Sequence, residues 1–231
     1  MRALFPVFVV ASLGLAGCAG QGPSDDPIGR NLTWFSYLSG EDVRAKCLAG
    51  GSDRYRLVYN AIYAEQVRSY DLISDGVGGN LSMEIRVSGA ANLSGFYPGD
   101  PFGPWRGVLA SARLGPADRA QLDAALAASG FDEPAKKGKF LRSDSYYWIA
   151  SACRAGRFHF NAWSAPSAEF DRIEFFDILL RHDTSGIPGN PVRQLYLGPF
   201  RPYGYDGGSA ETVNFQVQIG ENGLNLGPRW R

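Results

Sequence analysis

Two histidines are the side chains of this chain best suited to acid–base chemistry near neutral pH. His159 alternates with Phe158 and Phe160 in a stretch typical of a strand, so its side chain is expected on the face opposite the two rings. His182 precedes Asp183 near the end of a predicted helix, where a histidinium is favoured by the helix dipole. A structural role explains both positions.

Four carboxylates crowd one short segment, where a pair could act as general acid and base on a glycosidic bond. They are Glu169, Asp171, Glu174 and Asp177. A solvated polar face explains the same spacing without catalysis. The chain has no His-Glu-x-x-His motif, no Gly-x-Ser-x-Gly elbow, no Walker phosphate loop and no Gly-x-Gly-x-x-Gly fingerprint after a strand. We therefore predict no enzymatic activity, no cofactor and no metal site, with a periplasmic hydrolase of cell-wall or glycan material as the alternative.

The N-terminus carries an export pattern. Met1 and Arg2 are followed by an almost wholly apolar run over 3–15, which is shorter than the 20 or so residues of a membrane-spanning helix. The run ends in Leu15-Ala16-Gly17-Cys18, which resembles the lipobox of bacterial lipoprotein precursors. The resemblance implies that residues 1–17 are a signal peptide and that Cys18 becomes the lipid-bearing first residue. An ordinary secretory signal cleaved elsewhere is the alternative.

The same resemblance predicts how the protein is held. Cys18 would carry a diacylglycerol and often a further acyl chain, and since each buried methylene contributes roughly 0.8 kcal/mol, several chains hold stably. Ala19 stands where an aspartate usually retains lipoproteins at the inner membrane, which favours the outer membrane facing the periplasm. Residues 18–31 are rich in Gly, Pro, Ser and Asp and predict a flexible tether. One globular domain is expected over 32–231, with a sub-boundary near 186–191 as an alternative.

Two further cysteines, Cys47 and Cys153, are left once Cys18 is lipidated. An even number of cysteines in an exported protein predicts a disulfide, and two buried free thiols are the alternative.

The charge of the chain is balanced, with 23 basic and 23 acidic residues. No basic stripe offers a surface for phosphates, which argues against a nucleic-acid partner. Lys136, Lys137 and Lys139 form one basic cluster in a predicted loop. Solvation explains this cluster, and contact with anionic lipid is the alternative.

The hydrophobic pattern predicts an α+β fold, a mainly antiparallel sheet with two or three helices packed on it. A helix capped by Ser39 is expected over 39–48, with Cys47 against the core, and a second helix begins at Pro116 and ends at Gly130. The segment 167–182 suits a helix or a buried strand, and we favour the helix. Strands are expected over 55–62, 67–73, 81–87, 105–114, 146–153, 157–163, 194–197, 212–219 and 224–226.

Aromatic residues in Gly- and Pro-rich loops are the candidate contact surface, because rigid aromatic side chains bind sugars or proteins at low entropic cost. They are Phe96, Tyr97, Phe102, Trp105, Tyr203 and Tyr205. Covering the ends of a small β core is the alternative role. The sequence therefore predicts a lipid-anchored cell-envelope protein with a binding or structural role, held in the membrane through Cys18, whose partner is another envelope protein or a glycan.

Overall fold

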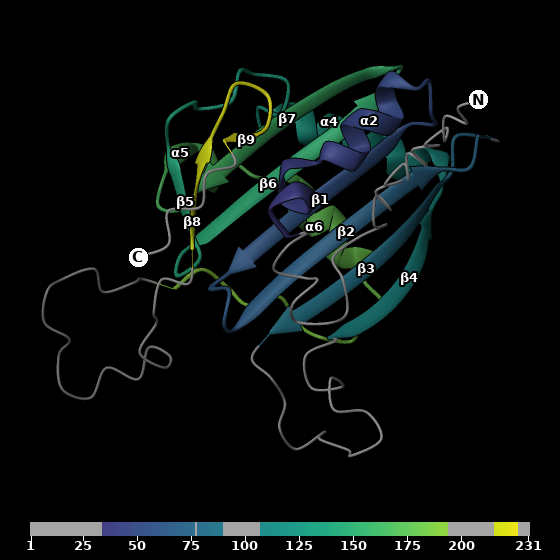
Figure 1. The fold of residues 1–231 in the computed structure, drawn as a ribbon. Helices are drawn as coiled ribbons and strands as arrows, with labels where there is room; N and C mark the ends of the chain where they lie inside the picture. Colours follow the sequence, from purple (N-terminus) through teal and green to yellow (C-terminus); the bar gives the residue numbers. More distant parts are fainter. Residues whose placement is uncertain (1–33, 77, 90–106, 194–214, 226–231) are drawn as a thin grey trace, which may run out of the picture.

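The computed structural model describes residues 34–76, 78–89, 107–193 and 215–225 (Figure 1). Its centre is an antiparallel sheet of six strands in the order β4-β3-β2-β1-β6-β7. The strands are β1 (Arg54–Ala61), β2 (Gln66–Ser74), β3 (Leu81–Gly89), β4 (Val108–Leu114), β6 (Tyr146–Arg154) and β7 (Arg157–Ser164). The predicted α+β fold with a mainly antiparallel sheet is confirmed, and so are the meander of β1–β3 and the hairpin of β6 and β7.

Helices cover one face of the sheet, which we call the lower face. They are α4 (Pro116–Ala128), α5 (Ala168–Asp171) and α6 (Phe175–Arg181). Alternation along the strands places Tyr59, Tyr70 and Trp148 on this face, where they pack with Leu122 of α4 and Phe175 of α6. The side chains of this lower layer form the largest hydrophobic cluster among the described residues.

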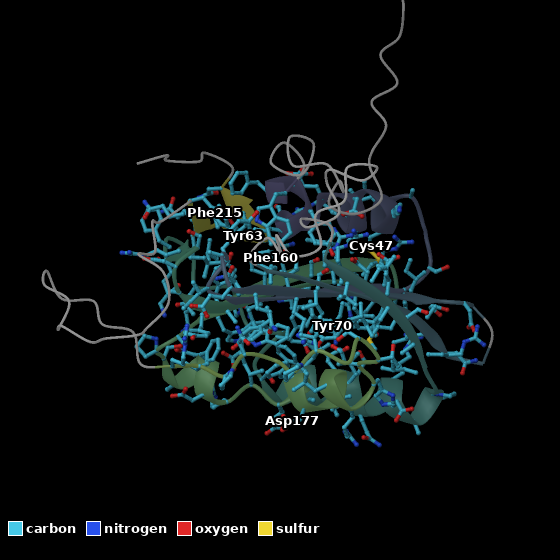
Figure 2. All side chains as sticks on the ribbon, turned by 90° about the horizontal axis from the view of Figure 1, so that it is seen from below. Cys47, Tyr63, Tyr70, Phe160, Asp177 and Phe215 are labelled. Atoms are coloured by element: carbon cyan, nitrogen blue, oxygen red, sulfur yellow. A yellow bond between two sulfur atoms is a disulfide. The ribbon has the colours of Figure 1, made fainter. Side chains whose placement is uncertain are left out.

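The upper face is covered over β1, β6 and β7 by three smaller elements. They are a short helix over 34–39, α2 (Glu41–Leu48) and a second sheet of β5 (Phe140–Arg142), β8 (Gln216–Ile219) and β9 (Leu224–Asn225). Figure 2 shows the layers edge-on, with Tyr70 below the central sheet and Phe160, Tyr63 and Phe215 above it. Alternate residues of β1 and β6 therefore face two separate cores.

Ser39 does not cap α2, contrary to the prediction. Gly40 is the N-cap residue, at a φ of 68°, and no side chain caps the helix. The Ser39 hydroxyl instead accepts a hydrogen bond from the backbone N–H of Leu224 at 3.2 Å. Ser39 thus ties the helix over 34–39 to the second sheet, a long-range contact that local spacing does not reveal.

The segment 167–182 is helical, as favoured, but it breaks into α5 and α6. Ser167 caps α5 by accepting a hydrogen bond from the N–H of Phe170. In one continuous helix Phe170 and Phe175 would lie about 140° apart around the axis, since each residue turns about 100°. The break lets both rings reach the lower core, and the N–H of Glu174 donates to Ser129 Oγ at 2.9 Å.

Candidate functional site

The upper face of β2, β3 and β4 carries polar side chains. The antiparallel register aligns Arg56 of β1 with Asp71, Asp71 with Glu84, and Glu84 with Ser111. Figure 1 shows α2 lying over β1 and β6, beside these three strands. A hollow of about 440 Å³ lies where α2 meets the strands, within the range of about 300–1,000 Å³ found for small-molecule sites.

Arg56 forms one wall of the hollow and is held by two carboxylates. Its Nη1 and Nη2 donate to the two carboxylate oxygens of Asp42 at 2.5 and 3.0 Å, and its Nε donates to Asp71 Oδ1 at 2.7 Å. The guanidinium also lies 3.7 Å from the ring centroid of Tyr37, whose hydroxyl donates to the other oxygen of Asp71. Every carboxylate oxygen in this group therefore has a partner, and the group joins α2 and the helix over 34–39 to the sheet.

The electrostatics of this group follow from its burial and its pairing. Burial acts to raise the pKa of Asp42, but the hydrogen bonds and charge of Arg56 outweigh it and hold that pKa below its usual value. Burial likewise acts to lower the pKa of Arg56, and the charge of Asp71 and the contacts with Tyr37 and Asp42 outweigh it and raise that pKa. Arg56 is thus a fixed cation whose charge is balanced within the protein by Asp42 and Asp71.

The remaining wall of the hollow is formed by Lys46 of α2 and Arg54 of β1, and its floor carries Ser82, Glu84 and Ser111. Glu84 lies 3.5 Å from Arg86, and more than half of its side-chain surface is exposed. The Nε of Arg54 is buried and has no hydrogen-bond partner in the structure. The hollow therefore presents two basic groups on one side and hydroxyls with one carboxylate on the other.

A second hollow, of about 460 Å³, lies between α2 and the turn of the second sheet. Arg44 points into this region and donates to the backbone oxygen of Asn222, while its guanidinium lies 4.4 Å from the ring centroid of Phe158. Because Arg44 is already bound to the protein on two sides, we take the first hollow as the candidate site.

The predicted disulfide is confirmed. Cys47 of α2 and Cys153 of β6 are bridged, with their Cα atoms 5.5 Å apart, and both residues are buried. The bridge fixes α2 beside the hollow, next to Val43 and Phe158. The predicted lipidation site Cys18 and the predicted aromatic surface lie outside the described residues. That surface comprises Phe96, Tyr97, Phe102, Trp105, Tyr203 and Tyr205.

The four carboxylates considered for catalysis do not line either hollow. Asp171, Glu174 and Asp177 are exposed, and Figure 2 shows Asp177 pointing away from the sheet on the outer side of the lower layer. Glu169 lies 3.6 Å from Lys136, whose side chain is about half exposed. Their arrangement matches the solvated face expected from the spacing.

The histidines contact the lower layer. His159 lies edge-on to Phe131, with ring centroids 5.0 Å apart, while Phe160 of the same strand packs in the upper core. His182, the C-cap residue of α6, lies 3.4 Å from Asp118 in the first turn of α4. Neither histidine lines the candidate site.

No motif in the sequence marks the residues that form the hollow. Arg54 and Arg56 occupy alternate positions of a strand whose next residue on that face, Val58, is fully buried. A buried arginine in a strand requires acidic partners. The alternation of Arg54, Arg56 and Val58 on one face of the strand therefore indicates a buried arginine. It does not identify which acidic residues are its partners.

Among the described residues no group of His, Cys, Asp and Glu is placed to hold a metal ion. In the same part of the chain, no helix has both the length and the apolar character needed to cross a membrane. Comparisons of the chain with protein-family models, curated proteins and solved structures find no match. The function is therefore inferred from the residues of this chain alone.

Proposed function

We propose that this chain is a lipid-anchored protein of the bacterial cell envelope that binds a glycan or another envelope component in the hollow beside α2. The observation that carries the binding role is the hollow itself, which is lined by Lys46 and Arg54, by the hydroxyls of Ser82 and Ser111, and by apolar side chains such as that of Ile73. A concave surface that combines apolar side chains with a few polar groups is typical of ligand sites. The absence of a recognisable catalytic motif favours binding over catalysis.

Two features support the location in the envelope. Leu15-Ala16-Gly17-Cys18 resembles a lipobox, and the disulfide between Cys47 and Cys153 is of a kind that persists in oxidising compartments. A lipid on Cys18 would place the globular domain at the membrane surface, at the end of the tether over 18–31. The outer membrane facing the periplasm is the location that Ala19 favours.

The anchor is tested by metabolic labelling in a bacterial host. The full chain is expected to incorporate labelled palmitate and to fractionate with membranes, because acyl chains on Cys18 bury many methylene groups. The Cys18→Ser variant is expected to lose the label and to leave the membrane fraction. Wild-type protein without label, in membranes or not, would contradict the proposed anchor.

The binding role is tested by photo-cross-linking in intact cells. A benzoylphenylalanine in place of Ser82, which is exposed at the hollow, is expected to give a discrete adduct on irradiation. The same residue in place of Asp177 is the matched control, because Asp177 is also exposed but lies beyond the lower layer. Equal adducts at both positions, or none at the Ser82 position, would show that the hollow is not the contact surface.

A further inference from the structure

We infer that the hollow contains a carboxylate subsite formed by Lys46 and Arg54, and that its ligand is an acidic, hydroxyl-rich molecule such as a carboxylated sugar. This inference rests on the proposed binding role of the hollow and specifies its ligand. Four features of the lining carry it: the acidic residues, the basic residues, the total charge and the polar groups of the floor.

Two of the acidic residues in the lining are already occupied. Both oxygens of Asp42 accept from Arg56, and the two oxygens of Asp71 accept from Arg56 and from Tyr37. The side chains of Asp42 and Asp71 are only 16% and 22% exposed. All four oxygens of these carboxylates are therefore engaged within the protein, and Lys46 acts on Asp42 only through its charge, without an ion pair within 4.0 Å.

Lys46 and Arg54 are not neutralised in this way. Within the part of the chain that the structure describes, neither has an ion pair with an acidic group within 4.0 Å, whereas Arg56 has two. The terminal guanidinium nitrogens of Arg54 and the ammonium of Lys46 are the donors that an anion in the hollow would use. A guanidinium matches the geometry of a carboxylate.

The total charge of the lining favours a single negative charge on the ligand. Arg56, Lys46 and Arg54 are balanced by Asp42, Asp71 and Glu84. A dianion such as a phosphate monoester loses more hydration energy than a monoanion when it enters the hollow, and a lining without net charge offers no surplus of positive charge to offset this larger cost.

The floor of the hollow explains the preference for hydroxyl groups on the ligand. Ser82 and Ser111 carry hydroxyls that both donate and accept, and exposed Glu84 accepts. These three residues lie on adjacent strands of the same sheet face, because Glu84 pairs with Ser111 and Ser82 is two residues away on β3. A sugar ring bearing one carboxylate can therefore place its acidic group at the basic wall and its hydroxyls on the floor.

The test uses the full lipidated chain in detergent and saturation-transfer NMR with three probes: glucuronate, glucose and glucose 6-phosphate. Glucuronate is expected to bind at least about tenfold more tightly than glucose, since one charge-assisted contact is worth at least this factor. Glucose 6-phosphate is expected to bind more weakly than glucuronate. Equal binding of glucuronate and glucose, tighter binding of the phosphate, or no binding of glucuronate would overturn the inference.

Matched variants locate the binding. Lys46→Gln and Arg54→Gln, singly and together, are expected to weaken glucuronate binding, by at least about tenfold in the double variant. Arg113→Gln is the control, because Arg113 is an exposed arginine on the same face but outside the hollow. Lys46 lies on the surface helix α2. A Lys46→Gln variant that unfolds at the same temperature as the wild type is still folded, so any loss of glucuronate binding is then a loss of the binding contact. An adduct at Ser82 in cells without a glucuronate preference would overturn the ligand class and leave the binding role standing.

Discussion

Replacing Cys47 and Cys153 together with alanine is expected to lower the free energy of unfolding by about 4–5 kcal/mol. The bridge joins residues 106 positions apart, and the chain-entropy model assigns about 4.7 kcal/mol at 25 °C to a cross-link that closes a loop of about 100 residues. Urea unfolding of the oxidised wild type and of the Cys47→Ala/Cys153→Ala variant measures the difference.

Reductant supplies the control for this prediction. Adding it is expected to destabilise the wild type towards the variant and to leave the variant unchanged, whereas Cys18→Ser alone is expected to unfold like the oxidised wild type. Equal unfolding free energies for the oxidised wild type and the double variant would mean that the bridge does not constrain the unfolded chain.

The disulfide also bears on the candidate site, because α2 has little stability of its own. It is 8 residues long, shorter than the 12–15 or so that an isolated helix needs to be even marginally stable in water. Its place on the sheet depends on attachments to other elements, among them Cys47 to Cys153, Asp42 to Arg56 and Arg44 to the backbone of Asn222. Both Lys46 and Asp42 of the hollow are thus positioned by contacts with distant strands.

The elements that could be predicted are those with a strong local pattern. Alternation over 55–62, turn residues near Asp75 and the cap pattern before Pro116 each specify a local structure from neighbouring residues alone. The position of Cys47 against the core follows from the helical spacing of Val43 and Cys47, which are both buried. These local rules were sufficient for the meander and for the hairpin of β6 and β7, whereas the disulfide was predicted from the even number of cysteines in an exported chain.

The features that could not be predicted, such as the strand β5 and the partners of Arg56, depend on residues far away along the chain. The strand β5 has 3 residues and exists because it pairs with β8, which lies more than 70 positions later. Likewise, Arg56 is neutralised by Asp42 and Asp71, and local spacing alone does not single out these carboxylates. The hollow is formed by residues that such pairings bring together from separate strands, so these residues form no motif in the sequence.

Replacing Asp183 with alanine is expected to cost about 3–5 kcal/mol of unfolding free energy, because it leaves the buried cation of Arg68 unpaired. The side chains of Arg68 and Asp183 are 0% and 4% exposed, and they form an ion pair in the lower layer. Tyr70 donates to Asp183 Oδ2 at 2.9 Å, and Arg68 also donates to the backbone oxygen of Ile187. The pair thus fastens the segment after α6 to β2.

Urea unfolding of the wild type and of Asp183→Ala measures this loss, and two further variants serve as comparisons. Arg68→Met with Asp183→Leu removes both charges, so its loss is expected to be much smaller than that of Asp183→Ala. Arg142→Ala breaks an ion pair with Asp144 at 2.6 Å, but the Arg142 side chain is 49% exposed, so a loss of about 0–1 kcal/mol is expected. A double variant as unstable as Asp183→Ala would show that apolar side chains cannot replace the pair.

The dependence on pH follows from the same carboxylate. Burial acts to raise the pKa of Asp183, but hydrogen bonds from Ser185 and Tyr70 and the charge of Arg68 outweigh it and hold the pKa below its usual value. Because the unfolded chain then binds a proton more readily than the folded one, this stabilisation is complete above the ordinary aspartate pKa of about 3.9 and is lost as the pH falls through the lower folded value. The unfolding free energy of the wild type is therefore expected to fall between pH 6 and pH 3 by more than that of the Arg68→Met/Asp183→Leu variant. Parallel curves for the two proteins would mean that Asp183 titrates alike in the folded and unfolded chains, and the ion pair would then not be the source of the stability measured at neutral pH.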